Sequence, residues 1–156
     1  MTLPSNRSMP DCTVIPELVV EDVARAAAWL CQAFGFTERW HAGGHRVQLA
    51  VGAGAVALTE PRVGQGFAAP DDAAFRIPRP REVNHSAMVR VEDVDRHHER
   101  ARRHRARVLQ PPETYPYGER QYTAEDPDGP RWSFSQTVAD VAPEDWGGTS
   151  TARPAP

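Results

Sequence analysis

Apolar and polar positions change their period several times along the chain, which predicts alternating strands and helices. Residues 13–20 are a short run rich in β-branched side chains. Over residues 23–34 the apolar side chains recur three and four positions apart, the spacing of one helix face. Asp22 is the expected N-cap of this helix and Gly35 its expected end. Three strand-like runs follow, over residues 37–41, 45–51 and 55–59, with glycine-rich turns between them.

The second half of the chain repeats this order. We expect a strand over 85–91, a helix over 94–106, and strands over 108–110, 120–125 and 131–137, the last two joined by the Asp-Pro-Asp-Gly turn at 126–129. The tetrapeptide Val-Glu-Asp-Val occurs at 20–23 and again at 91–94, each time where a strand gives way to a helix. Coincidence is the alternative, but it would also have to explain the matching order of elements. The pattern therefore predicts two copies of a βαβββ unit.

A chain of 156 residues is expected to form one compact domain. We place a leader at 1–12, the domain at 13–138 and a partly flexible tail at 139–156. Within the domain, module one covers 13–60 and module two covers 84–138. The linking loop 61–83 is rich in Pro, Gly, Arg and Asp, and loops of that length are usually functional or mobile.

Net charge and charge pattern limit the classes of partner that the protein is expected to bind. The formal net charge of −3 creates no positive field that would attract nucleic acid or anionic lipid. The segment 94–107 holds six Arg and three His, but Asp95 and Glu99 interleave with them, so we expect a solvated outer helix and no nucleic-acid partner. Salt-sensitive retention on DNA would favour the opposite hypothesis.

Hydropathy, the N-terminal pattern and residue composition also predict the cellular location of the protein. No apolar run approaches the roughly 18 residues of a membrane span, and the N-terminus lacks the pattern of a secretion signal. Cys12 and Cys31 have no metal-binding spacing. All 18 basic residues are Arg, and there are 15 Pro, a composition typical of GC-rich, actinobacterial-type genomes. We expect a cytoplasmic protein with no membrane partner.

Three segments resemble the vicinal oxygen chelate superfamily, whose members include glyoxalases, extradiol dioxygenases, fosfomycin-modifying enzymes and bleomycin-resistance proteins. They are residues 14–36, 85–102 and 117–136, the last with the strand–Asp-Pro-Asp-Gly–strand ending common in that family. The resemblance implies an α+β fold in which two βαβββ modules form an open, curled β-barrel with helices outside and a ligand cavity inside. It also implies a homodimer.

The resemblance further implies four metal-ligand positions, one on the first and one on the last strand of each module. Here they hold Ile15, Ala57, Ser86 and Ser133. Divalent metals in such sites need imidazole or carboxylate donors, so we expect no metal and no other cofactor. His85 lies one residue before a ligand position, and strand alternation turns it away from the cavity unless a bulge intervenes.

Strand alternation selects the side chains that face the expected cavity. The ligand-binding candidates are Glu17, Trp40, Gln48, Ser86, Met88, Arg90, Tyr117, Gln121 and Ser133. Structural roles remain open for some of them. Glu17 and Arg90 would then form an ion pair, Trp40 would be a core or dimer-interface aromatic, and Tyr117 would belong to a structural turn.

Two functions fit this cavity. The first is a small-molecule-binding protein that binds or sequesters a natural product or antibiotic, as the bleomycin-resistance branch does. Bleomycin itself fits poorly, because capture of a strongly cationic drug favours a more acidic protein. The second is a metal-independent enzyme of secondary metabolism, an isomerase, hydrolase or cyclase, with Glu17, Arg90 and Tyr117 as acid, base and anion contacts. No catalytic residue can be identified from the sequence.

Overall fold

Each half of the chain folds into one strand, one helix and three further strands, which confirms the predicted fold class. The computed structural model describes residues 4, 6–61, 76–79 and 81–151. Module one contains β1 (Glu17–Val19), α1 (Val23–Phe34), β2 (Thr37–Ala42), β3 (Arg46–Val51) and β4 (Gly54–Thr59). Module two contains β5 (Ser86–Arg90), α2 (Val94–Arg103), β6 (Arg107–Thr114), β7 (Glu119–Glu125) and β8 (Arg131–Thr137). The short 3-10 turn η2 (Pro143–Trp146) follows.

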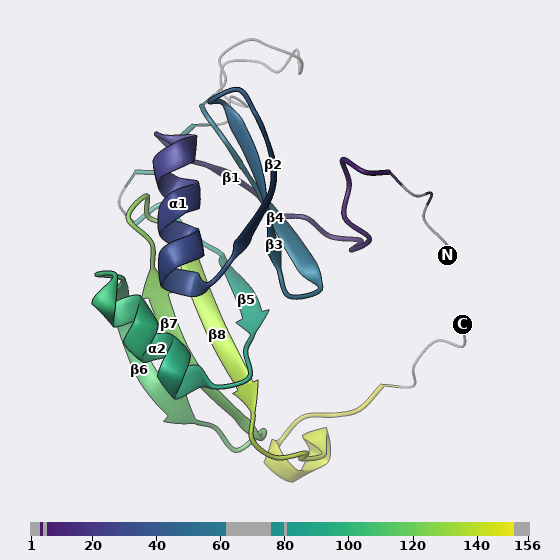
Figure 1. Ribbon diagram of the computed structural model, residues 1–156. Helices are drawn as coiled ribbons and strands as arrows, with labels where there is room; N and C mark the ends of the chain where they lie inside the picture. Colours follow the sequence, from purple (N-terminus) through teal and green to yellow (C-terminus); the bar gives the residue numbers. More distant parts are fainter. Residues whose placement is uncertain (1–3, 5, 62–75, 80, 152–156) are drawn as a thin grey trace.

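The two modules have the same sheet topology. The strand orders are β1-β4-β3-β2 and β5-β8-β7-β6. The first strand of each module pairs in parallel with the last, and all other pairs are antiparallel. Both helices lie on the same side of their sheets, and the opposite side is left open (Figure 1). This shared topology supports the internal duplication inferred from the repeated tetrapeptide.

The repeated Glu-Asp pairs begin the two helices in the same way. Asp22 accepts a hydrogen bond from the backbone N–H of Arg25, and Asp93 accepts one from that of Arg96, both at 2.9 Å. Each aspartate thereby satisfies a backbone donor that the first helical turn leaves free. Gly35 ends α1 in the left-handed conformation, as expected from the sequence.

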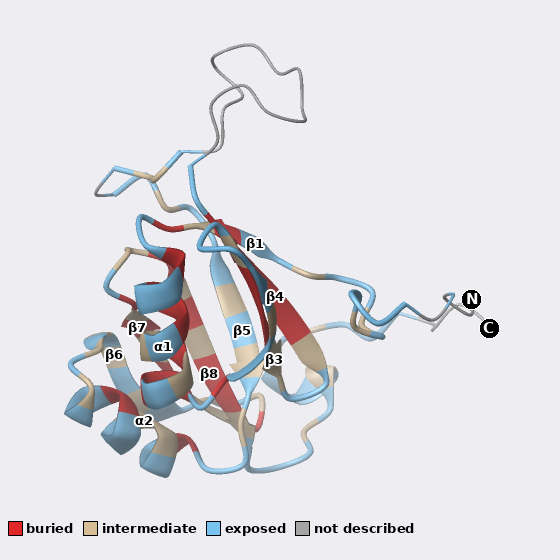
Figure 2. Ribbon diagram, turned by 45° about the horizontal axis from the view of Figure 1, so that its top comes forward, coloured by how far each residue is buried: buried red, intermediate tan, exposed pale blue. Residues whose placement is uncertain are grey.

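A single core joins the two modules within the chain. Buried side chains of α1, α2 and the helix-facing sides of both sheets form one cluster, drawn in red beneath the helices in Figure 2. Phe34 of α1 packs against Phe134 and Trp132 of β8, with ring centroids 4.7 and 5.9 Å apart. Burial of these large aromatic side chains therefore fixes how the modules sit against each other.

Several element ends differ from those expected. β1 is shorter than the predicted 13–20 because Pro16 precedes it and has no N–H to donate. α2 ends at Arg103 rather than 106, and Arg105 already has a left-handed φ of 62°. β6 extends over Pro111 and Pro112, which an edge strand with register shifts tolerates.

The domain boundaries at 13 and 138 stay predictions, and most of the predicted loop 61–83 lies outside the described residues. Among the helices that the structure describes, none is both long and apolar enough to cross a membrane.

Candidate functional site

The sides of the two sheets that face away from the helices form what we call the open face. In the strands that contribute to the core, alternate residues enter the core cluster, such as Leu18 on β1 and Phe134 on β8. The residues between them lie on the open face, and on β5 these are Ser86, Met88 and Arg90, all exposed. This is the side on which alternation places the candidate ligand-binding residues.

A cavity of about 520 Å³ lies between the sheets, where β4 approaches β5. Ligand pockets in proteins have volumes of about 300–1,000 Å³. Three candidate residues, Ser86, Met88 and Arg90, line the cavity together with apolar and small side chains of module one. Met88, with its thioether side chain, is 63% exposed. Such a lining, apolar with a few polar groups, suits an organic ligand.

On the open face of module one, the candidate residues are already held by protein partners. Arg46 of β3 donates a hydrogen bond to Glu17, so the structural alternative left open for Glu17 takes Arg46 as its partner and not Arg90. The Gln48 side chain is only 2% exposed and accepts a hydrogen bond from Arg39, which lies at a β-bulge in β2. The indole N–H of half-buried Trp40 donates to the backbone carbonyl of Ser8 at 3.0 Å.

On the open face of module two, a chain of hydrogen bonds runs across three strands and ends at an aromatic turn. The hydroxyls of Ser135 and Thr137 donate to the two carboxylate oxygens of Glu119 at 2.5 and 2.6 Å. The Gln121 amide donates to Ser135 at 3.0 Å. Arg90 and Tyr117 complete the chain, donating to Thr137 and to Gln121 respectively, each at 3.0 Å. We call these six residues the Glu119 network.

The network and its surroundings set the charge of Glu119, at its centre, and of Tyr117, at one end. Hydrogen bonds from Ser135 and Thr137 lower the pKa of Glu119, and the positive charge of Arg90 lowers it further. Glu119 is therefore ionised at neutral pH. Partial burial raises the pKa of Tyr117, and negative charges nearby, including that of Glu119, raise it too. The Tyr117 phenol stays protonated and can donate a hydrogen bond.

The sequence-based list captured part of this network. It contains Arg90, Tyr117 and Gln121, and alternation also places Ser135 on the open face. It omits Glu119 because the predicted strand begins at Arg120, one residue too late. The period of two that selects Gln121 and Thr123 also selects Glu119, so extending the strand by one residue would have found it.

The residues at the four expected ligand positions do not fit a divalent metal. Ile15 precedes β1, Ala57 is buried without a donor, and Ser86 is exposed. The Ser133 hydroxyl lies 3.4 Å from that of Thr123. His85 is exposed just before β5. In the described parts of the chain, no three His, Cys, Asp or Glu side chains group closely enough to hold a metal ion.

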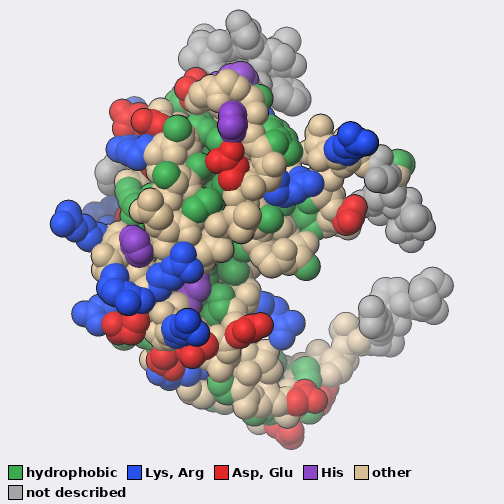
Figure 3. Space-filling view, in the orientation of Figure 1, with side chains coloured by type: hydrophobic (Ala, Val, Ile, Leu, Met, Phe, Trp, Pro, Cys, Tyr) green, Lys and Arg blue, Asp and Glu red, His purple; other side chains and the backbone are tan. Residues whose placement is uncertain are grey.

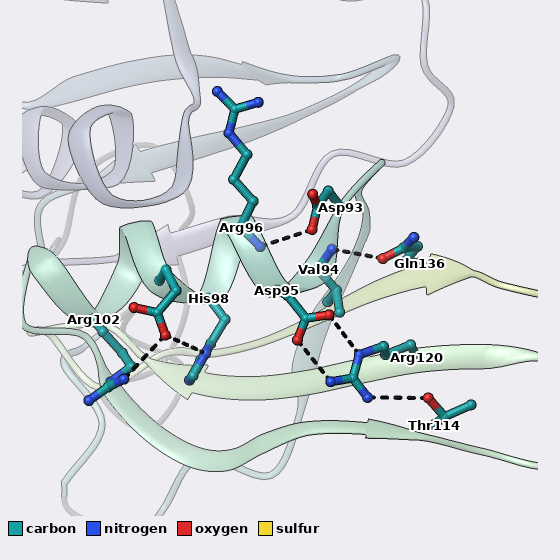
Figure 4. Close-up of polar contacts among 10 residues, drawn as sticks. Asp93, Val94, Asp95, Arg96, His98, Arg102, Thr114, Arg120 and Gln136 are labelled. Carbon is teal, nitrogen blue, oxygen red and sulfur yellow. Dashed lines mark hydrogen bonds and ion pairs between the residues drawn. The ribbon is translucent and has the colours of Figure 1, made fainter.

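The arginine-rich helix α2 carries acidic partners on the same surface. Arg120 of β7 forms a bidentate pair with Asp95 at 2.8 and 2.9 Å, and Arg102 lies 3.2 Å from Glu99 (Figure 4). Basic side chains gather over this helix, with acidic ones among them (Figure 3). The absence of a nucleic-acid partner stays a prediction, which this mixed charge favours.

Comparison with known proteins places this geometry in a family. The family model described as Glyoxalase/Bleomycin resistance protein/Dioxygenase superfamily matches residues 12–134. TioX from Micromonospora sp. ML1 has a similar structure, with a TM-score of 0.65 and 26% identity over 81% of this chain and 99% of TioX. No protein among the curated ones matches the chain.

Two further solved structures show the same fold at lower identity. A glyoxalase-related enzyme from Fulvimarina pelagi has a TM-score of 0.64 and 18% identity, over 90% of this chain and 99% of that one. Lactoylglutathione lyase from Agrobacterium tumefaciens has a TM-score of 0.59 and 21% identity, over 81% of this chain and 94% of that one. From the family match and the paired βαβββ modules, the chain belongs to the glyoxalase/bleomycin resistance protein/dioxygenase superfamily.

Proposed function

We propose that this protein binds a small organic molecule on its open face without using a metal ion, and that it binds or sequesters a natural product or antibiotic. The observation that carries the proposal is the donor set at the four family ligand positions. Two apolar side chains and two hydroxyls cannot replace the imidazoles and carboxylates that a divalent metal requires.

The cavity and the Glu119 network support binding of an organic ligand. The cavity offers apolar surface around Met88, which favours burial of carbon groups. Next to it, Arg90 supplies charged N–H donors, and the network holds this side chain in place through Thr137. A few oriented polar groups beside an apolar surface give a ligand both affinity and orientation.

An enzymatic role would need an acid or base whose proton or lone pair can be offered to the substrate. The three residues considered for it all have partners: Glu17 has Arg46, Tyr117 has Gln121 and Arg90 has Thr137. We therefore propose binding rather than turnover. The two functions separate in one assay, because an enzyme would convert a candidate ligand at a rate that falls in Glu17→Gln, whereas a binding protein returns it unchanged.

The test is native mass spectrometry of the protein purified from its own host, with elemental analysis of the same sample. We expect an organic adduct that denaturation releases, and less than about 0.1 equivalent of zinc, nickel, manganese or iron, because two hydroxyl ligands bind such ions weakly. Adding Zn²⁺ to the pure protein should leave its melting temperature unchanged. A stoichiometric metal that resists dialysis and is lost on Ser133→Ala would overturn the proposal.

A further inference from the structure

The chain beyond β8 returns to the aromatic turn at the end of the Glu119 network. The backbone N–H groups of Val138 and Ala139 both donate to the carbonyl of Gly118, at 2.8 and 3.1 Å. Gly118 has a φ of 80°, and a Cβ at this position would lie 2.2 Å from the Ala139 oxygen. Only glycine permits this close approach, which directs the following turn η2 toward Tyr117.

Turn η2 places an indole beside the two tyrosines of the aromatic turn. The rings of Tyr115 and Tyr117 stack at 5.1 Å with an angle of 5° between their planes. The ring centroids of Trp146 and Tyr117 lie 5.6 Å apart, with an angle of 64° between the ring planes. Trp146 is 43% exposed. Two aromatic planes at this angle form a corner in which a flat ring can stack on one wall and present its edge to the other.

Acidic side chains lie on both elements that form this corner. Glu119 is linked to Tyr117 through the network, and Glu113 adds negative charge at the Tyr117 phenol. Glu144 and Asp145 precede Trp146 on η2, and Figure 3 shows acidic groups at the end of the molecule that this turn occupies. Arg90 is the basic side chain bonded into the network, while the nearby Arg120 is paired with Asp95. A flat ring that carries positive charge gains attraction from both the acids and the aromatic faces.

Turn η2, which carries Trp146, lies after residue 134, where the family match ends, whereas Tyr117 lies within the matched range. We propose, building on the small-molecule binding proposed above, that Trp146 and Tyr117 form an acidic aromatic subsite for a flat, positively charged aromatic ring system. The C-terminal turn thereby sets which ligands the open face accepts.

The test uses two probes with the same ring and opposite charge, pyrene-1-methylammonium and pyrene-1-sulfonate, titrated into the full chain at fixed ionic strength. The four tryptophans are labelled with 5-fluorotryptophan, and the Trp146 resonance is assigned with Trp146→Phe. We expect the cationic probe to shift the Trp146 resonance and to bind about tenfold more tightly than the sulfonate. Trp29, on the helix side of the molecule, is the internal reference.

Substitutions show whether Trp146 contacts the ligand or only packs the C-terminal segment against the domain. We expect Trp146→Ala to weaken binding of the cationic probe about tenfold, and Trp146→Phe to keep it within about threefold, because a phenyl ring still stacks. Glu144→Gln combined with Asp145→Asn should reduce the preference for the cation. The matched control is Val138→Ala, which shortens an exposed apolar side chain at the base of the tail and should leave affinity unchanged.

The inference would be overturned by equal affinity in Trp146→Ala, by equal or tighter binding of the sulfonate, or by no binding of the cationic probe. A shift confined to Trp40 would do the same while leaving small-molecule binding on the open face intact. The proposed function is tested by a different measurement. If mass spectrometry finds no organic adduct in protein purified from its host, small-molecule binding itself is wrong.

Discussion

Half-buried His97 and buried Asp126 make contributions to stability that depend on pH in opposite directions. His97 of α2 lies 3.0 Å from the carbonyl of Phe34 through Nε2 and 2.7 Å from the Tyr122 hydroxyl through Nδ1. The carbonyl can only accept, so Nε2 carries the proton and Nδ1 accepts from Tyr122. Burial lowers the pKa of His97 below its usual value, so its contribution is complete above the unfolded value of about 6.5 and is lost as the pH falls from there through the lower folded pKa.

Asp126 contributes a pH dependence of stability with the opposite sign to that of His97. Its side chain accepts from the Trp132 indole at 2.8 Å and from the Asp128 backbone at 2.9 Å, and the residue is only 7% exposed. Burial raises the pKa of Asp126 to about 6. A raised carboxyl pKa adds stability that is complete below the unfolded value near 3.9 and is lost as the pH rises through about 6.

Removing the Asp126 carboxyl should therefore expose the acid sensitivity that His97 confers. Between pH 7 and pH 5 the Asp126 contribution grows by about 1 kcal/mol, and Asp126→Asn loses this gain. We expect the free energy of unfolding to fall more on acidification in Asp126→Asn than in the wild type, as measured by urea denaturation at pH 5, 6 and 7. Asp140→Asn, at an exposed position, is the control. Identical pH slopes in wild type and Asp126→Asn would contradict this assignment.

At the scale of elements, the end of α1 is tied to α2 through one arginine. Arg100 donates to the carbonyls of Gln32 and Cys31 at 2.7 and 3.0 Å. Gly35 lies beneath it, and a Cβ on Gly35 would lie 2.9 Å from an Arg100 nitrogen. The left-handed glycine thus both ends the helix and leaves room for the side chain that joins the two helices.

Gly35→Ala should cost more stability than Gly52→Ala. Both glycines have positive φ, at 77° and 57°, but a Cβ at Gly52 meets nothing within 4 Å. Backbone strain of about 1 kcal/mol applies to both, and displacement of Arg100 adds about 1 kcal/mol to Gly35→Ala alone. Urea denaturation measures the difference, which should disappear in an Arg100→Ala background. If Gly35→Ala still costs more stability than Gly52→Ala in the Arg100→Ala background, displacement of Arg100 is not the cause of the difference.

At the scale of the whole molecule, the core fills the helix side and leaves apolar side chains on the open side. Val14 and Met88 are exposed at the cavity between the sheets. The homodimer that the family resemblance implies stays a prediction, since one chain does not test it. Size-exclusion chromatography with light scattering, at micromolar protein concentration, should give twice the mass of the chain. A mass equal to that of one chain, unchanged on concentration, would contradict it.

The predictions from sequence succeeded where the signal is local. Helical spacing, the Asp22 and Asp93 caps and the repeated tetrapeptide predict both helices and the two-module fold, because neighbouring residues set these features. Alternation likewise predicts which side of each strand enters the core. The side chains at the four ligand positions that the family resemblance implies can also be read from the sequence, while the absence of a metal stays a prediction.

Only the tertiary structure decided which polar groups meet. The Glu17–Arg46 pair joins residues 29 positions apart, and the hydrogen bond from Arg90 to Thr137 joins residues 47 positions apart. Neither the return of Trp146 to Tyr117 nor the sharing of one core by both modules has a local signature. Such contacts depend on how sheets and helices pack. Packing reflects the burial of the whole apolar surface at once, which no short stretch of sequence specifies.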